Sequence, residues 1–237
     1  MGNDYRHSFI NKAVSEDYIL GHVKEHFAAV DILEDENFIS LMYYYGMLTI
    51  CGGFGILKKL RIPNNNIRKQ FYTYIRSRFP KLAAVNISEL EIQYANAAML
   101  GEWKVMFSYI AASYSKAAAN RNSIEGERNI QGYFMAYLNI NPYYLMCPEL
   151  EFNHGYCDIF LMPDKRFKDV LHSYIIEFKY IGTKEKPEKT QEKFAEAKAQ
   201  LEVYAADEKV RNLTDGTTLH KIVMVFKGLE LEKMEEV

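Results

Sequence analysis

The sequence predicts a mixed α/β fold preceded by a mainly helical region, and three observations carry this prediction. Residues 15–110 read mostly as helices. Three strand-like runs separated by turn residues follow over 143–181. A long polar helix and a β-branched strand complete the order helix, three strands, helix, strand, which is typical of a mixed α/β domain. We therefore expect a helical unit at residues 1–110 and an α/β domain at 111–237.

The N-terminal part is expected to contain helices and one small hairpin. SEDYILGHVKEHF begins with Ser15 at a plausible N-cap, and Asp35 is a second cap candidate. TICGGFGILKKLRIPN (49–64) has two short apolar runs around three glycines, which indicates a hairpin. The helical pattern IRKQFYTYIRSRF follows it. Helices, a hairpin and a further helix predict a compact unit that resembles a winged helix.

The elements of the α/β domain follow from apolar periodicity and turn residues. GERNIQGYFMAYLN (126–139) is predicted as an amphipathic helix. A second helix is expected at residues 189–210. Four strands are expected at residues 143–152, 155–163, 173–181 and 220–228.

The composition is that of a soluble globular protein, with 49% apolar and 25% charged residues. Its three cysteines form no CxxC pair, which favours reduced thiols in a cytoplasmic protein and weighs against a zinc site. The longest apolar run is too short to span a bilayer, so we expect no membrane contact. With a net charge of −2, contact with nucleic acid must depend on a local patch.

The predicted strand SYIIEFKY (173–180) carries Glu177 and Lys179 among apolar residues. Side chains alternate along a strand, so these two share one face, and burying ions costs several kcal/mol. Asp158, in the preceding strand, would join them if the two strands pair as a hairpin. Two converging carboxylates repel unless a divalent cation lies between them, and Mg²⁺ prefers such oxygen ligands. The pattern therefore predicts a metal site for hydrolysis of a phosphate ester.

GYCDIFLMP and SYIIEFKY together resemble the core of the PD-(D/E)XK nuclease superfamily. From about residue 16 onward, the chain also resembles the C-terminal half of bacterial proteins in which an AAA-ATPase-like domain precedes such a nuclease domain. The resemblance implies a restriction-endonuclease-like αβββαβ core and a hydrolase that uses Mg²⁺ or Mn²⁺ to cut DNA. It also implies an AAA-ATPase-like domain as a partner, although the chain has no G-x-x-x-x-G-K-[ST] motif.

The resemblance assigns roles to the central motif by position. Asp158 takes the place of the acidic D, and Glu177-Phe178-Lys179 takes the place of E-x-K. Asp158 and Glu177 would be metal ligands, the Phe178 carbonyl would be a third ligand, and Lys179 would be the catalytic lysine.

Further positions match the superfamily pattern or depart from it. Glu127 matches an acidic residue on the first core helix, and Gln200, with Tyr204 one turn later, matches a glutamine-bearing helix after the E-x-K strand. Cys157 stands where the signature has proline. Gln131 stands where relatives often have histidine, which leaves the role of that position open.

Each of these residues also has a plainer interpretation. The Asp158, Glu177 and Lys179 side chains could form a cross-strand salt-bridge cluster on a solvated sheet face. Glu127 could be an acid favoured at a helix N-terminus, and Gln200 could belong to a surface pair.

The segment 56–81 contains eight Lys or Arg residues and no acid, with interleaved aromatics. Such a segment could follow phosphates and stack on bases. It could equally be a solvated wing and helix, or it could dock on the acidic segment 31–36 or on an ATPase domain. Its aromatics are expected in the core; they are Phe71, Tyr72, Tyr74 and Phe79.

Two classes of function therefore compete at the end of the sequence analysis. The first is a metal-dependent nuclease. The second is a catalytically inactive nuclease-fold module that binds nucleic acid or a partner ATPase domain. A winged-helix DNA-binding regulator is a third interpretation, but it rests on residues 35–80 alone.

Overall fold

The computed structural model describes residues 2–16, 18–26, 31, 34–77, 85–119, 126–152 and 155–237. The chain divides into two compact units, Met1–Ser77 and Arg78–Val237. We expected the boundary near residue 110; the helices at 87–100 and 103–119 belong instead to the second unit, where they cover a sheet.

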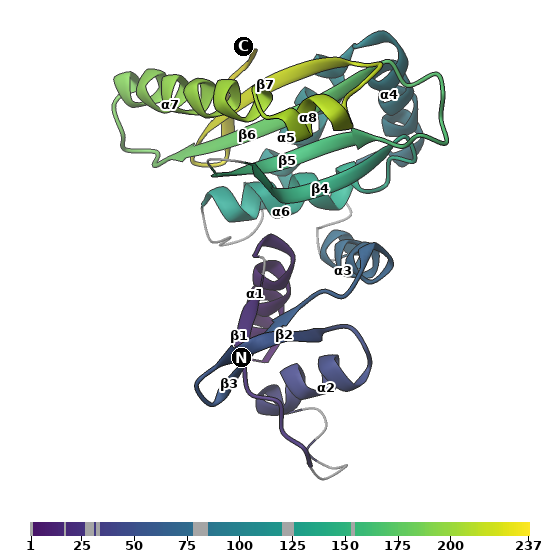
Figure 1. Cartoon of the computed structure of the whole chain (residues 1–237). Helices are drawn as coiled ribbons and strands as arrows, with labels where there is room; N and C mark the ends of the chain where they lie inside the picture. Colours follow the sequence, from purple (N-terminus) through teal and green to yellow (C-terminus); the bar gives the residue numbers. More distant parts are fainter. Residues whose placement is uncertain are drawn as a thin grey trace. The chain divides into compact units, whose positions relative to one another are not determined.

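The N-terminal unit combines helices with a three-stranded antiparallel sheet (Figure 1). Its elements are α1 (Gly2–Ser15), β1 (Ile19–Gly21), the 3₁₀ turn η2 (Asp35–Asn37), α2 (Phe38–Tyr44), β2 (Thr49–Phe54), β3 (Leu57–Arg61) and α3 (Asn65–Ser77). The strand order is β1-β3-β2. The hairpin expected over residues 49–64 is confirmed as β2 and β3, and Gly55, with φ +60°, lies in its turn.

Two expectations for this unit are wrong. Ser15 does not begin a helix: α1 ends there, and the next described element is the strand β1. Ile19 is buried opposite Leu60 in that strand, so tertiary packing overrides the helical appearance of the segment. Asp35 makes no side-chain cap for α2, which begins after Asn37; its carboxylate pairs with Arg6 at 2.9 Å.

The aromatic residues of the basic segment lie where a core would place them. Phe71 and Tyr72 are buried on α3, as expected, and Tyr74 is half-buried. Phe79 lies outside the described residues, as do residues 32 and 33 of the acidic segment.

The C-terminal unit has a five-stranded sheet of order β4-β5-β6-β7-β8 between helices (Figure 1). Its elements are α4 (Ile87–Leu100), α5 (Trp103–Ala119), α6 (Glu127–Leu138), β4 (Tyr144–Phe152), β5 (Gly155–Pro163), β6 (His172–Ile181), α7 (Pro187–Ala205), α8 (Glu208–Leu213), β7 (Thr218–Lys227) and β8 (Glu230–Glu236). Strands β6 and β7 are parallel, and the other neighbours are antiparallel.

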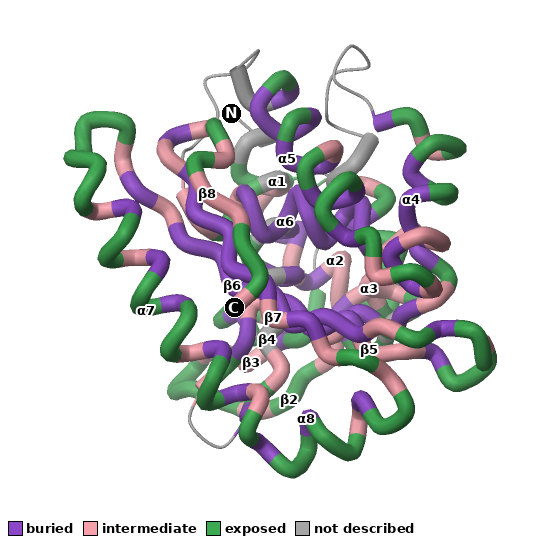
Figure 2. Tube along the Cα trace, turned by 90° about the horizontal axis from the view of Figure 1, so that it is seen from above, coloured by how far each residue is buried: buried purple, intermediate pink, exposed green. Residues whose placement is uncertain are grey.

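The two faces of this sheet are covered by different helices. The Phe178 ring of β6 packs on Phe134 of α6, and the Tyr174 ring packs on Phe107 of α5. Ile175, between them in sequence, belongs to the apolar cluster under α7. Figure 2 shows β6 and β7 buried along most of their length, whereas α7 exposes one side to solvent. The sheet is therefore the middle layer, and β6 and β7 lie at its centre.

The expected order helix, three strands, helix, strand is confirmed as α6, β4, β5, β6, α7 and β7. One expected helix is divided: α7 ends at Ala205, and Asp207 then caps α8 by accepting a hydrogen bond from the Lys209 amide. The edge strand β8 was not expected, because Glu230–Glu236 is rich in charge and lacks β-branched residues.

Candidate active site

Strands β5 and β6 separate next to Asp158. Leu161 pairs with Tyr174 across the two strands, and the pairing continues only as far as Ile159 with Ile176. Beyond that point the Asp158 side chain takes the place of a backbone acceptor from the neighbouring strand. Its Oδ2 accepts a hydrogen bond of 2.7 Å from the Phe178 amide. The carboxylate is thereby held at a fixed position beside the middle of β6.

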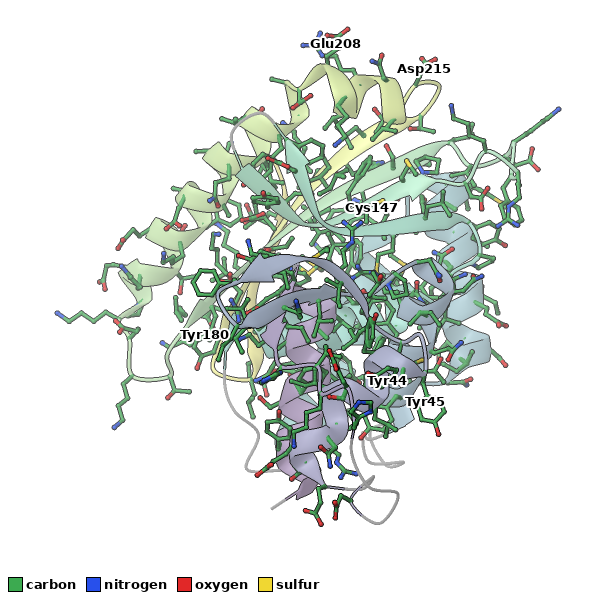
Figure 3. All side chains as sticks on the ribbon, turned by 60° about the horizontal axis from the view of Figure 1, so that its bottom comes forward. Tyr44, Tyr45, Cys147, Tyr180, Glu208 and Asp215 are labelled. Carbon is green, nitrogen blue, oxygen red and sulfur yellow. The ribbon has the colours of Figure 1, made fainter. Side chains whose placement is uncertain are left out.

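Glu127 occupies an equivalent position two residues further along β6. It is the first residue of α6, and its Oε2 accepts a hydrogen bond of 3.2 Å from the amide of Tyr180, which Figure 3 labels. Amides of alternate residues in a strand point to the same side. Glu127 and Asp158 therefore lie along the side of β6 from which β5 has turned away.

Glu177 and Lys179 form a buried ion pair on β6. Their residues are 3% and 7% exposed, and Lys179 Nζ donates to Glu177 Oε1 at 2.9 Å. The second oxygen of Glu177, Oε2, is buried and makes no hydrogen bond of ordinary geometry among the described residues, although the Asp158 backbone lies close enough to the carboxyl group to oppose the rise in its pKa. A buried charged acceptor without a partner is costly, so this oxygen marks a position that favours a further cation or donor.

Burial and mutual repulsion shift the pKa values of this group. Burial raises the pKa of Asp158 well above its ordinary value, and the charge of Glu177 raises it further, against the opposing Phe178 amide. Burial also raises the pKa of Glu177, although Lys179 opposes that shift. Burial alone would lower the pKa of Lys179, but the Glu177, Glu127 and Asp158 charges raise it overall. The group holds three carboxyl groups and a single ammonium, so a further cation would offset the repulsion that raises the pKa of Asp158.

Gln131 holds Asp158 from the α6 side. Its buried side-chain amide Nε2 lies 3.2 Å from the Asp158 carbonyl oxygen and 3.5 Å from Asp158 Oδ1. The sequence left the role of this position open, and the structure places it against the proposed metal ligand. A signal was present in the sequence, because Gln131 is four residues after Glu127 and so lies on the same face of the helix.

Helix α7 brings Tyr204 close to the cluster, whereas Gln200 makes no hydrogen bond to it among the described residues. The Tyr204 hydroxyl donates to the Tyr156 carbonyl at 3.0 Å. Burial, followed by the charge of Glu177, raises the pKa of Tyr204 to about 12. Gln200 is half-buried, and its Oε1 is buried without a hydrogen-bond partner in the described part of the chain. Tyr204 therefore lies close enough to the cluster to be affected by its charge. The role of Gln200 stays a prediction.

The donor atoms near Asp158 suit a hard divalent cation. Asp158 and Glu177 offer carboxylate oxygens, and the Phe178 carbonyl faces the same side of β6 as the Phe178 amide. All of these donors are oxygens, which Mg²⁺ prefers, and Glu177 Oε2 has no other partner among the described residues. Within the described ranges, no three His, Cys, Asp or Glu side chains are grouped closely enough to hold a metal by themselves. Water and substrate oxygens would therefore have to complete the coordination.

Comparison with known families is consistent with this order of helices and strands. The model of the PD-(D/E)XK nuclease superfamily matches residues 125–236, from the start of α6 to the end of β8. Residues 125–236 belong to the PD-(D/E)XK nuclease superfamily. Nucleases of this superfamily generally use divalent metal ions and bind nucleic acid.

The match is confined to the C-terminal part of the chain. No curated protein and no solved structure matches the chain. The PD-(D/E)XK model does not extend to the N-terminal unit, so the expected link to an AAA-ATPase-like domain stays a prediction. None of the helices in the described ranges has the length and hydropathy needed to cross a membrane.

Proposed function

We propose that this protein is a metal-dependent nuclease that hydrolyses phosphodiester bonds in DNA. The observation that carries the proposal is the cluster beside β6, where three carboxyl groups share one ammonium and a buried carboxylate oxygen, Glu177 Oε2, has no hydrogen-bond partner among the described residues. Asp158, Glu177 and the Phe178 carbonyl would hold Mg²⁺ or Mn²⁺. The bound ion would lower the pKa of a water molecule and stabilise negative charge on the scissile phosphate.

Lys179, Glu127 and Gln200 would each have a separate role in the reaction. Lys179 holds Glu177 in place and offers its other two N–H donors to the attacking water or to the phosphate oxygens. Glu127 adds a third acidic group that favours a cation in the cluster, and it contributes, after Glu177, to raising the pKa of Lys179. Gln200 offers a buried acceptor, Oε1, that we assign to the substrate or to an ordered water.

A cleavage assay tests this function directly. Wild-type protein should cut labelled single- and double-stranded DNA in Mg²⁺ or Mn²⁺, and EDTA should stop the reaction. Lys179→Gln should lower the rate by about 10²-fold or more, because it removes a charged donor from the reacting phosphate. Asp158→Asn should do the same, and it keeps an acceptor for the Phe178 amide. The exposed Lys165→Gln provides a charge-matched control.

The same assay separates the nuclease from an inactive binding module. That second function is favoured by one observation: Asp158 already accepts a hydrogen bond from the Phe178 amide. If wild type and both variants are equally inactive while all three bind DNA, the binding module is correct and the nuclease proposal is wrong.

We also propose that the N-terminal unit is a winged helix. The β1-β3-β2 order and the β2–β3 hairpin, preceded by α1 and α2, support this topology. In that arrangement the hairpin would be the wing.

A further inference from the structure

One face of the three-stranded sheet in the N-terminal unit points away from the core. Ile19 and Leu60 lie opposite one another on the inner face and are buried. The neighbouring residues must then point outward, because side chains alternate along a strand. We call this surface the outer sheet face; its residues, placed by the strand register, are Leu20, Phe54, Leu57, Lys59 and Arg61.

Large apolar side chains on and beside this face are exposed to solvent. Phe54 is 61% exposed and Leu20 is 41% exposed. Ile56, in the hairpin turn next to Phe54, is 83% exposed. Exposed large apolar residues that gather in one place indicate a binding surface more often than isolated ones do.

All of the charged residues in the strands of this sheet are positive. Strand β3 contributes Lys58, Lys59 and Arg61, while β1 and β2 contribute no charged residue. These three cations form no ion pair with the described residues, whereas Asp35 and Glu36 are paired with cations outside the sheet. By strand alternation Lys59 and Arg61 lie on the outer sheet face, and a face with cations and no acid among its described strand residues is complementary to a polyanion.

Lys59 is held in position on the outer sheet face. Its side chain lies across Gly52, where an added Cβ would be 3.5 Å from Lys59 Cδ. Its ammonium lies 4.2 Å from the centroid of the Tyr18 ring. A cation that is already ordered loses less conformational entropy when it binds an anion.

We propose that the outer sheet face binds single-stranded nucleic acid, with Phe54 stacking on a base while Lys59 and Arg61 contact phosphates. An exposed aromatic ring flanked by cations is the combination that binds single strands, because every unpaired base presents a π-face. The proposal rests on the proposed nuclease function and deepens it by naming the class of substrate.

Fluorescence anisotropy with the full chain in EDTA tests the proposal without any cleavage. The probes are a labelled 20-nucleotide oligo-dT and a labelled 20-base-pair duplex, each titrated at several salt concentrations. Oligo-dT should bind more tightly than the duplex. Phe54→Leu keeps an apolar side chain but removes the ring, and it should weaken oligo-dT binding at least about five-fold, the lower end for one stacked base. Phe54→Tyr keeps the ring and should bind as wild type does.

The two cations are tested by the salt dependence of binding. Lys59→Gln combined with Arg61→Gln should lower the slope of log K against log salt by about 1.4, since each phosphate contact with a single strand contributes about 0.7. Lys165→Gln combined with Lys168→Gln, at exposed positions in the C-terminal unit, should leave the slope unchanged.

Several outcomes would overturn the proposal. Duplex binding equal to or tighter than oligo-dT binding would do so, as would affinity that Phe54→Leu leaves intact. Binding to anionic phospholipid vesicles with no oligonucleotide binding would assign the face to a membrane surface instead. Because no metal is present, a failure here is distinct from a failure of the cleavage assay.

Discussion

Asp158 is held by contacts that would otherwise belong to a neighbouring strand. The Phe178 amide and the Gln131 side chain both donate to it, while Glu177 lies close enough to raise its pKa. The Asp158 carboxylate thus accepts the hydrogen bond of the Phe178 amide where β5 separates from β6, and it is also one of the acidic groups of the cluster. Such repulsion between like charges lowers the stability of the folded protein for as long as no cation offsets it.

The first prediction at the residue scale concerns the stability of the metal-free protein. Asp158→Asn should raise Tm by a few degrees in EDTA, because it removes a buried, repelled charge and keeps a hydrogen-bond acceptor; about 1 kcal/mol corresponds to about 2–4 °C in a protein of this size. Thermal denaturation measures the change, and the exposed Asp169→Asn is the control. A Tm at or below that of the control would show that Asp158 carries no such strain.

The second residue-scale prediction concerns pH. His172 Nδ1 lies 2.8 Å from His220 Nε2, and His220 Nδ1 lies 2.7 Å from Glu236 Oε1. Burial, followed by the charge of His220, lowers the pKa of His172, so protonation is easier in the unfolded chain. The contribution of His172 to the free energy of unfolding should therefore be fully present above about pH 6.5 and should decrease as the pH falls below it.

Urea denaturation between pH 5 and pH 8 checks this prediction. The difference in unfolding free energy between wild type and His172→Gln should shrink in the direction of low pH. A difference that stays constant over this range would contradict the assignment.

At the scale of elements, α6 and α4 fix the positions of groups on β6. Helix α6 supplies both Glu127 and Gln131 from one face. Gly101 caps the C-terminus of helix α4; it has φ +73° and lies against the ring of His172. Both ends of β6 are therefore positioned by helices on the same side of the sheet.

Gly101→Ala tests the second of these contacts. An alanine there would adopt a left-handed conformation, which costs about 1–2 kcal/mol, and its Cβ would approach the His172 ring to 2.8 Å. We expect the free energy of unfolding to fall by at least that amount, measured by urea denaturation. Gly182→Ala is the matched control, because its nearest neighbour would be the Glu185 side chain at an ordinary 3.8 Å. Equal stability of the two variants would show that Gly101 has no special role.

At the scale of the whole molecule, the sequence predicts local structure better than it predicts distances. Apolar periodicity places β4 to β7 correctly, and the D…ExK spacing brings Asp158 beside Glu177 once β5 and β6 pair. The separation of β5 from β6 cannot be predicted, because it depends on a side chain replacing a strand. The strand β1 is missed for a related reason, since only its contact with β3 makes it a strand. The charged edge strand β8 shows no pattern that distinguishes it from a polar tail.

Titration of the metal-free protein with Mn²⁺ in a calorimeter, without nucleic acid, tests most directly whether the cluster beside β6 holds a divalent cation. We predict that wild type binds Mn²⁺ and that Asp158→Asn binds it at least about ten-fold more weakly, since one carboxylate ligand is lost. Asp169→Asn should bind as wild type does. Equal heats and affinities for wild type and Asp158→Asn, or no binding to either, would contradict the central claim.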